Sequence, residues 1–351
     1  MMQLIFGLIL TVLATPVLIR AAHHYNLLDR PDERKHHEGA IPVVGGLAMG
    51  FAIAVVAAWQ LADTDIFWGL FAAVSTIVVV GFLDDRGGLP VAVRFLAQAT
   101  AGLVVALFGG AQLAGLGDLV GTGLVTLGVM TVPFTIFAMV GVANAFNLSD
   151  GMDGLAGGLA MITAAFLAAA AHLSGSEETF VLLLILGGAL AGFLCFNMRL
   201  PWQCHAKVFM GDSGSLMLGF LLAWAVIRVT QAENNALPPA AALWFFAIPL
   251  MDTVRLLVGR ALSGRNPFHH DRDHLHHILS RAGYTDAQVV WIIHFAAVTF
   301  GMVGFFGWRA GVPEAVMFCG FLAVFSVYSI TVKNAGKLIR PLGGMRRIAG
   351  R

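Results

Sequence analysis

A series of long apolar runs occupies most of the chain and constrains its fold more than any other feature. Charged residues make up only 12% of the sequence, against about 25% in a soluble domain. Most runs reach the ~20 residues that a helix needs to cross a bilayer. We therefore predict an all-α polytopic membrane protein with about eleven transmembrane helices. The runs cover residues 1–19, 42–61, 66–83, 92–110, 123–143, 154–173, 179–197, 213–230, 239–258, 288–308 and 313–332.

The basic residues predict how the chain is oriented in the membrane. Of the 21 Lys and Arg residues, all but Arg228 and Arg309 lie in alternate connections between the runs. Cytoplasmic segments are enriched in Lys and Arg, so the N-terminus is predicted to be periplasmic and the C-terminus cytoplasmic. Residues 1–332 then form the membrane domain, and 333–351 a basic cytoplasmic tail against anionic headgroups. The basic segments are 20–41, 84–94, 198–212, 255–287 and 333–351.

The densest polar group between apolar runs reads Asn-Ala-Phe-Asn-Leu-Ser-Asp-Gly-Met-Asp-Gly-Leu, from Asn144 to Leu155. Its amides and carboxylates follow a three-residue spacing, which a helix would keep within one broad stripe. Ionisable groups beside long apolar runs are costly and indicate function. The alternative is a polar turn between two buried helices, with one Asp as a cap. The density of Asp, Asn and Gly favours a functional site that contains Asn144, Asn147, Asp150 and Asp153.

An adjacent acidic pair, Asp84-Asp85, follows the apolar run that ends at Leu83 and precedes Arg86-Gly87-Gly88. Neighbouring carboxylates at a membrane repel one another, and a divalent cation or a raised pKa on one of them relieves the repulsion. Mg²⁺ typically binds one or two carboxylates together with substrate phosphates. A solvated turn is the alternative interpretation.

A third polar segment, Lys207 to Ser215, reads Lys-Val-Phe-Met-Gly-Asp-Ser-Gly-Ser and opens an apolar run. This order places Asp212 at a predicted helix N-terminus, beside two glycines and two hydroxyl groups. Backbone amides and the helix dipole favour a phosphate there, either directly or through a bridging metal ion. An ordinary N-cap is the alternative. Lys207 supplies a candidate positive charge for a substrate.

A histidine-rich loop reads Asn-Pro-Phe-His-His-Asp-Arg-Asp-His-Leu-His-His, from Asn266 to His277. It could bind phosphate, sugar or a metal ion. A zinc site is disfavoured, because no Cys lies near and the sequence has no His-Glu-x-x-His helix. A solvated polar loop is the remaining alternative. The candidate binding residues in this loop are Arg272, His274, His276 and His277.

A mixed-charge loop runs from Asp29 to Gly46 into a glycine-rich helix start. Lys35 and Arg34 could bind anions, or they could anchor the loop to the inner leaflet. The predicted orientation places this loop, both acidic motifs, Asp212 and the histidines on the cytoplasmic side. Hydropathy and basic charge carry no information about carboxylate chemistry, yet they bring all the candidate groups to one membrane face.

These motifs together resemble the polyprenyl-phosphate N-acetylhexosamine-1-phosphate transferases, and the resemblance covers nearly the whole chain. The matching motifs are Asp84-Asp85, the Asn-x-x-Asn-x-x-Asp-Gly-x-Asp-Gly of 144–154, the Phe-x-Gly-Asp-x-Gly-Ser of 209–215 and the histidine loop. The branch looks like WecA rather than MraY. Ile41-Pro-Val-Val-Gly-Gly46 is similar to the WecA entry into the second span. His274-Leu-His-His277 resembles its His-Ile-His region, with Leu275 in place of Ile.

The resemblance implies an enzyme that transfers N-acetylglucosamine 1-phosphate from UDP-GlcNAc to undecaprenyl phosphate and releases UMP. Its product would serve synthesis of O-antigen or a related cell-envelope glycan. The expected cofactor is Mg²⁺, with Mn²⁺ as the alternative. The expected location is the bacterial inner membrane, with the active site on the cytoplasmic face. Besides the two substrates and membrane lipids, the partner considered is a second copy in a homodimer; no nucleic acid is expected.

The resemblance also assigns roles to residues. Asp212 would bind Mg²⁺, and Asp84 and Asp85 would help to hold the metal or deprotonate the lipid phosphate. The histidines would contact the diphosphate or sugar, and we favour direct attack by the lipid phosphate over a covalent phospho-aspartate route. The remaining nucleotide-sugar candidates are Lys35, Asn144, Asn147, Asp150, Asp153, Lys207 and Arg272.

Three alternatives stay open at this point. The same reaction with another UDP-N-acetylhexosamine is the closest, because the motifs define nucleotide and metal chemistry rather than sugar stereochemistry. A membrane zinc hydrolase would use the histidine loop. A transporter would place charged or broken segments deep in the spans and show inverted repeats, and no internal repeat is visible in the sequence.

Overall fold

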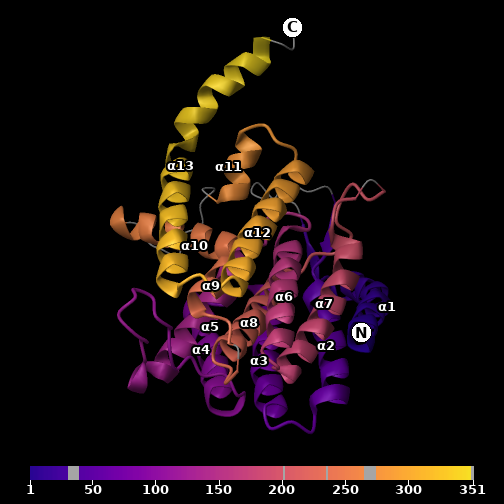
Figure 1. Cartoon of the computed structure of the whole chain (residues 1–351). Coiled ribbons are helices and arrows are strands. Elements are labelled where there is room, and N and C mark those ends of the chain that lie inside the picture. The colour runs from indigo at the N-terminus through magenta and orange to yellow at the C-terminus, as the bar shows by residue number, and fades with distance from the viewer. Residues whose placement is uncertain (31–38, 201, 235, 265–273, 349–351) are drawn as a thin grey trace.

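The computed structural model describes residues 1–30, 39–200, 202–234, 236–264 and 274–348, with side chains in the last helix as far as residue 334. Figure 1 shows a bundle of helices in which α11 and the C-terminal part of α13 lie at the top, and the α2–α3 connection lies at the bottom. The helices are α1 (Met2–Tyr25), α2 (Gly45–Leu61), α3 (Phe67–Gly87), α4 (Val91–Phe108), η1 (Gly128–Met130), α5 (Thr131–Ser149), α6 (Leu155–Leu173), α7 (Glu177–Asn197), α8 (Gly211–Thr230), α9 (Pro239–Phe245), α10 (Ala247–Leu262), α11 (Leu275–Arg281), α12 (Asp286–Arg309) and α13 (Glu314–Ile348).

Each predicted apolar run contains a helix, which confirms the all-α membrane architecture. Within the described ranges, nine helices are long and apolar enough to cross a membrane, and a bent pair formed by α9 and α10 would make ten. The helix α2 is also apolar but has 17 residues. The predicted count of eleven would require both the bent pair and α2, so that count and the orientation of the termini stay predictions.

Two predicted helix boundaries are wrong. The run at 239–258 is broken, because α9 and α10 meet at an angle of 90°. Pro249 explains the break, since its ring removes the amide that would bond the carbonyl of Phe245 and clashes with that carbonyl. The run at 123–143 also begins differently: Thr126 forms a bridge with Gly115, and the long helix starts only at Thr131.

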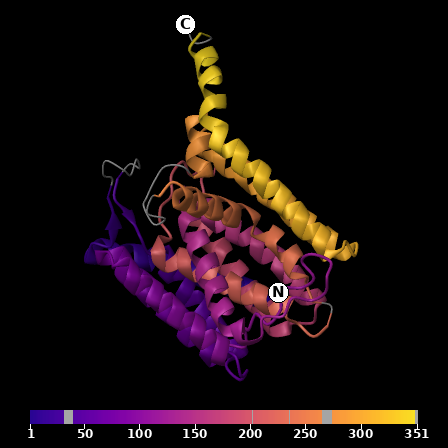
Figure 2. The same cartoon turned by 90° about the vertical axis from the view of Figure 1, so that its left-hand side faces the viewer.

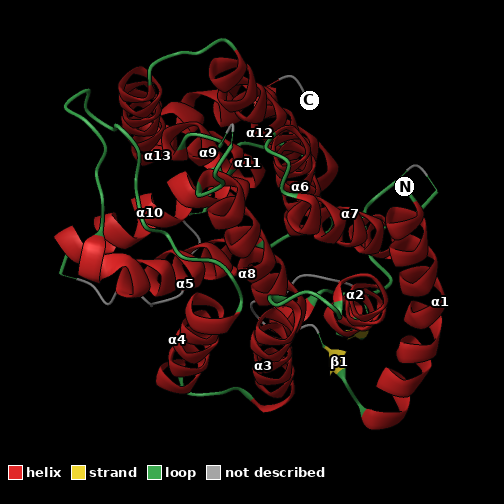
Figure 3. Ribbon diagram, turned by 60° about the horizontal axis from the view of Figure 1, so that its bottom comes forward, coloured by secondary structure: helices red, strands yellow, loops and turns green. Residues whose placement is uncertain are grey.

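The helix α8 is the centre of the bundle. In its most apolar stretch 83% of the residues are buried, compared with 17% in α1 and in the membrane part of α13. A helix that is apolar on all sides is typical of such a central position. Figure 3 shows α8 in the middle, with α2, α3 and α5 packed around it. The first turn of α8, which carries Asp212, is therefore enclosed by other helices.

Small residues let neighbouring helices approach the first turn of α8 closely. A β-carbon at Gly81 of α3 would overlap the backbone of Ser213, and one at Gly46 of α2 would overlap the backbone of Gly214. Close backbone approach at small residues is the usual way in which membrane helices pack. The approach at Gly81 brings the end of α3, and with it Asp84 and Asp85, beside the start of α8.

A short hairpin supports the same region. Strands β1 (Leu28–Asp29) and β2 (Ile41–Pro42) pair antiparallel. The chain that follows β2 is hydrogen-bonded to the residues before α8, through Phe209 N to Pro42 O at 2.8 Å and Gly45 N to Phe209 O at 2.9 Å. The paired strands are thereby held beside the segment that leads into α8.

The last helix runs along one flank of the bundle, and its C-terminal part projects beyond it (Figure 2). It continues without a break past residue 332, where the sequence predicted a separate tail.

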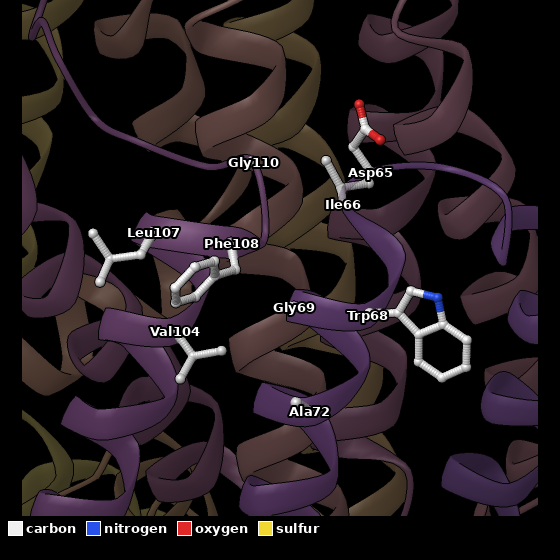
Figure 4. A pocket seen from close by; sticks show the side chains of 9 residues that line it. All are labelled: Asp65, Ile66, Trp68, Gly69, Ala72, Val104, Leu107, Phe108 and Gly110. Carbon is white, nitrogen blue, oxygen red and sulfur yellow. The ribbon is translucent and has the colours of Figure 1, made fainter.

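At the other end of the bundle, an open cavity of about 680 Å³ lies between the start of α3 and the end of α4. Its walls include Trp68, Val104 and Phe108, with Asp65 at the rim (Figure 4). It contains none of the candidate site residues; Asp84 and Asp85 lie at the opposite end of α3.

Candidate active site

Asp85 caps the central helix. Its Oδ1 accepts a hydrogen bond from the amide of Asp212 at 2.7 Å, and its Oδ2 accepts one from the amide of Ser213 at 3.1 Å. The first amides of a helix have no partner within that helix, so a carboxylate from α3 fills this role for α8. Gly211 allows the close approach: it has a φ of +73°, and a β-carbon there would crowd the Asp85 carboxylate. Asp85 therefore fixes the first turn of α8 and the place of Asp212.

Asp84 and Asp212 share the guanidinium of Arg94, which comes from the first turn of α4. Arg94 Nη1 lies 2.7 Å from Oδ2 of Asp84 and 3.8 Å from Oδ2 of Asp212. Asp84 also accepts the amide of Leu89 at 2.5 Å, and its side chain is buried, whereas that of Asp212 is about one-third exposed. Asp212 is thus the more accessible of the two carboxylates.

The two asparagines of α5 have different partners. Asn147 donates to Oδ1 of Asp212 at 2.6 Å and to Oγ of Ser215 at 3.0 Å. Asn144 instead donates to Oε1 of Gln98 in α4 at 2.5 Å. Asn147 therefore belongs to the carboxylate cluster, and Asn144 joins two helices beside it.

The predicted helical stripe from position 144 to 153 is wrong beyond residue 149. Helix α5 ends at Ser149, and the chain turns through residues 150–154 before α6 begins. Gly154 ends the turn with a φ of +81°, which favours glycine. Asp150 is the C-cap residue of α5 and Asp153 lies within the turn. The four side chains are therefore grouped by a helix end and a turn rather than by one helix.

This turn is locked to the segment that follows α7. Asp153 accepts Nε of Arg199 at 2.8 Å and the amide of Ala206 at 3.2 Å. Asn197 accepts the amide of Gly154 at 2.8 Å and donates to the carbonyl of Val208 at 2.9 Å. Asp153 is thereby committed to holding the turn in place.

Asp150, at the end of α5, lies near three other carboxyl groups. Its side chain is solvent-accessible, yet the surrounding protein still removes much of its hydration. This desolvation, followed by repulsion from Asp212, Asp85 and Asp153, raises the pKa of Asp150 to about 7. The group can therefore change charge close to neutral pH, and a bound cation would favour its ionised form.

The histidines form a row that faces the turn. The rings of His274 and His276 are stacked with centroids 5.6 Å apart, and His277 lies 4.2 Å from His276. A β-carbon at Gly151 would overlap the His276 ring, so Gly151 makes room for it. Burial, together with His277 and His274, lowers the pKa of His276 to about 3. His276 is therefore a neutral imidazole near pH 7, able to donate one hydrogen bond and accept another.

The structure gives less information about the three basic candidates. Lys207 precedes α8, and its side chain is exposed. Lys35 and Arg272 lie outside the described residues. The structure thus brings together Asp84, Asp85, Asn147, Asp150 and Asp212, with the histidine row across the turn from them.

The described side chains do not form a closed metal site. Within the described part of the chain, no three His, Cys, Asp or Glu side chains are arranged to surround a metal ion. The described histidines therefore provide no zinc site of that kind. Among the acids, Asp85 directs both oxygens to the amides of α8. Asp84 also has a donor on each oxygen, from Leu89 and Arg94. Asp212, which is about one-third exposed, is therefore the more open carboxylate of the pair. This suits an ion such as Mg²⁺, which needs one or two carboxylates and takes its other ligands from phosphates and water.

Comparison with known proteins identifies the family. A profile described as glycosyl transferase family 4 matches residues 67–230. The chain is 33% identical to the undecaprenyl-phosphate alpha-N-acetylglucosaminyl 1-phosphate transferase of Escherichia coli (strain K12), over 93% of this chain and 89% of the relative. It is 34% identical to that of Yersinia pestis, over 98% and 94%, and 33% identical to that of Haemophilus influenzae, over 99% and 98%.

Identity of about one-third across nearly the full length of both chains decides the assignment. The chain belongs to the polyprenyl-phosphate N-acetylhexosamine-1-phosphate transferase family. The family resemblance predicted from the sequence motifs is thereby confirmed, and the protein is a multi-pass membrane transferase.

Sequence reasoning missed two residues that contact the candidate site. Arg94 forms ion pairs with Asp84 and Asp212. In the sequence, its position at the start of an apolar run, soon after an acidic pair, could have indicated this role. Asp252 is buried and lies 2.9 Å from His274. It is an acid inside the run at 239–258, which the rule for ionisable groups in membrane helices would have singled out.

We expect the buried, neutral His276 to make the transferase sensitive to acid. The unfolded chain binds a proton at His276 near pH 6.5, whereas the folded protein does so only near pH 3. Stability therefore falls as the pH drops below about 6.5, by about 1 kcal/mol at pH 5.5 from this residue. The H276Q variant keeps a neutral polar side chain and should lose less stability. The measurement is the thermal unfolding midpoint in detergent at pH 7.5 and pH 5.5; an equal loss in both proteins would contradict the neutral state.

Proposed function

We propose that this transferase moves N-acetylglucosamine 1-phosphate from UDP-GlcNAc to undecaprenyl phosphate, with release of UMP. The observation that carries the proposal is the carboxylate cluster of Asp84, Asp150 and Asp212 at a helix N-terminus, at one end of a membrane bundle. The relatives' names supply the substrate, since they describe undecaprenyl-phosphate alpha-N-acetylglucosaminyl 1-phosphate transferases.

The reaction is a phosphoryl transfer between two anions. An oxygen of the lipid phosphate attacks the β-phosphorus of the nucleotide sugar and forms a new P–O–P bond. The bond between the β-phosphorus and the bridging oxygen breaks, and that oxygen leaves with its electron pair on UMP. Such transfers depend on alignment and charge neutralisation more than on covalent participation by the protein. Direct attack fits this chemistry, because the lipid phosphate is already a competent nucleophile near neutral pH.

The charge of the cluster supports a divalent cation. Asp84, Asp85, Asp150 and Asp212 contribute four carboxyl groups, and Arg94 contributes one guanidinium. An anionic substrate would be repelled by this excess of carboxylates. Mg²⁺, held by Asp212 with help from Asp84, would offset the charge and draw phosphate oxygens to the site. Mn²⁺ satisfies the same oxygen ligands.

The protein residues divide the remaining work. Asn147 orients the Asp212 carboxylate, and Asp85 holds the first turn of α8. The amides of that turn, beyond those used by Asp85, and the dipole of α8 favour an anion. Across the turn, the histidine row offers neutral and donor groups for the diphosphate or the sugar. Lys207 adds an exposed positive charge, and we assign Lys35 and Arg272 to the nucleotide sugar on the family resemblance.

We propose that the site lies at the cytoplasmic face of the bacterial inner membrane, because the distribution of Lys and Arg predicts that the candidate residues share that face. The lipid acceptor explains why the carboxylates lie at the end of a membrane bundle rather than in a soluble domain. Synthesis of O-antigen or a related envelope glycan is the role that we propose for the product. A homodimer stays a prediction.

A donor panel tests the proposal. Purified protein is incubated with undecaprenyl phosphate and Mg²⁺, and UMP release is followed for UDP-GlcNAc, UDP-GalNAc and a 6-deoxy N-acetyl sugar. We expect release with UDP-GlcNAc, loss with a chelator, and recovery with Mg²⁺ or Mn²⁺. Release with another donor alone would keep the mechanism and change the sugar. Recovery with Zn²⁺ but not Mg²⁺ would contradict the proposed site and favour a zinc enzyme.

A further inference from the structure

Asp252 connects three elements that lie far apart in the sequence. It belongs to α10, six residues into the helix that follows the 90° break. Its Oδ2 lies 2.9 Å from Nδ1 of His274, and its Oδ1 accepts the hydroxyl of Tyr328 of α13 at 2.7 Å. Arg255 lies 3.0 Å from Oδ1, which compensates the negative charge. Asp252 is buried, and each of its carboxylate oxygens has a hydrogen-bond or ion-pair partner. Its position therefore differs from that of a solvated surface carboxylate.

The contact with Asp252 determines which ring nitrogen of His274 carries a proton. An ionised carboxylate only accepts hydrogen bonds, so Nδ1 of His274 carries the proton that lies between them. In the neutral ring, Nε2 is then left as an acceptor. The amide of Leu275 also points to Asp252, at 3.3 Å from Oδ1 and 3.4 Å from Oδ2. Both the ring and the backbone at the start of α11 are therefore held by the same carboxylate.

The orientation of the His274 ring also constrains the ring of His276. Its ring is nearly parallel to that of His276, with 14° between the planes, and His276 lies against Gly151 of the acidic turn. Both histidines are buried, so neither ring can turn freely without disturbing the other. The row therefore lies against the 150–154 turn through His276, and Asp252 holds the row at His274.

We infer that Asp252 is a positioning residue for phosphoryl transfer, which fixes the tautomer and orientation of His274 and thereby places the histidine row against the 150–154 turn. Tyr328 supports it from α13. This inference rests on the proposed function, since it takes the row to contact the diphosphate or sugar of the donor. Carboxylates that orient a metal-binding histidine typically contribute 10- to 100-fold to activity, and we expect an effect of the same order for a histidine that contacts a substrate.

The test compares D252N, H274A and the double variant in the purified full-length protein. Asn keeps the size of the side chain and an acceptor for Tyr328, but it loses the charge. We expect D252N to raise the KM for UDP-GlcNAc and lower kcat by about tenfold each, with the KM for undecaprenyl phosphate unchanged. The double variant should be no worse than H274A alone, because Asp252 acts through His274. Y328F should show a smaller effect of the same kind.

A structural role would give a different pattern. It would lower the unfolding midpoint and the active fraction, leave the KM for the donor unchanged, and multiply with the loss caused by H274A. The matched control is E178Q, which breaks the 2.9 Å ion pair between Glu178 and Arg228 at the opposite end of the bundle. It should leave all kinetic constants unchanged. Multiplicative losses in the double variant, or wild-type constants in D252N, would overturn the inference.

A spectroscopic readout separates this inference from the proposed function. In protein labelled with ¹⁵N-histidine, the His274 signals, assigned by their loss in H274A, should show a protonated Nδ1 in the wild type and a change in D252N. An unprotonated Nδ1 in the wild type, or no change in D252N, overturns the pairing whatever the activity. If the wild type releases no UMP with any donor, the proposed function fails, and the kinetic role of Asp252 fails with it.

Discussion

The D212N variant should lose UMP release by about a thousandfold or more while it stays folded. Asp212 is the most exposed carboxylate of the pair that faces Arg94, and it lies in the first turn of α8. Asparagine keeps the size of the side chain and can still accept a hydrogen bond from Asn147. It removes the charge that a divalent cation requires, so the loss should be chemical rather than structural.

The measurement for D212N is kcat for UMP release at saturating UDP-GlcNAc and Mg²⁺, together with the unfolding midpoint in detergent. D65N is the matched control, because it makes the same replacement at an exposed Asp at the opposite end of α3. The control should have wild-type kcat. Activity close to that of the wild type in D212N would remove Asp212 from the metal site.

The D85N variant should lose both stability and turnover, through the geometry of α8. The two carboxylate oxygens of Asp85 accept the amides of Asp212 and Ser213, and asparagine would offer one acceptor and turn an amino group toward a donor. Loss of a helix cap costs about 1 kcal/mol. A shift of Asp212 by about 1 Å should lower kcat about a hundredfold.

The matched control for D85N is T285A, which removes the capping box of α12. It should lose a similar amount of stability and keep wild-type kcat, which separates a general cap effect from the special place of α8. If Asp85 were instead a metal ligand, D85N would keep its unfolding midpoint, and excess Mg²⁺ would restore turnover. That combination would contradict the cap role.

Hydropathy and motif order were enough to predict the helical membrane architecture and the family, because both depend on local sequence. The helix start at Asp212 was also predicted correctly, since Gly211 and the hydroxyls that follow mark it. The break before Pro249 was predictable in principle from the proline itself, but the apolar run around it concealed the boundary. The length of an apolar run indicates that the segment can lie in lipid, but it does not show whether the segment forms one straight helix.

The pairing of side chains could not be predicted from one sequence. Asp85 and Asp153 looked like substrate or metal groups, yet the structure uses both to hold backbone amides. Arg94 looked like an ordinary charge at a helix end, and the position of Asp252 within an apolar run marked it as unusual without naming its partner; each contacts a predicted site residue. These roles depend on which helices meet, and residue type or spacing along the chain does not specify that.

The measurement that tests the central claim most directly follows the β-phosphorus of the donor. Purified protein is given UDP-GlcNAc labelled with ³²P at the β-position, undecaprenyl phosphate and Mg²⁺, and the label is traced after lipid extraction. Transfer of the sugar 1-phosphate predicts that the label moves into the lipid-linked diphosphate product and that the released nucleotide is unlabelled UMP. Label that stays in the aqueous phase as UDP would show attack at the sugar carbon and contradict the account.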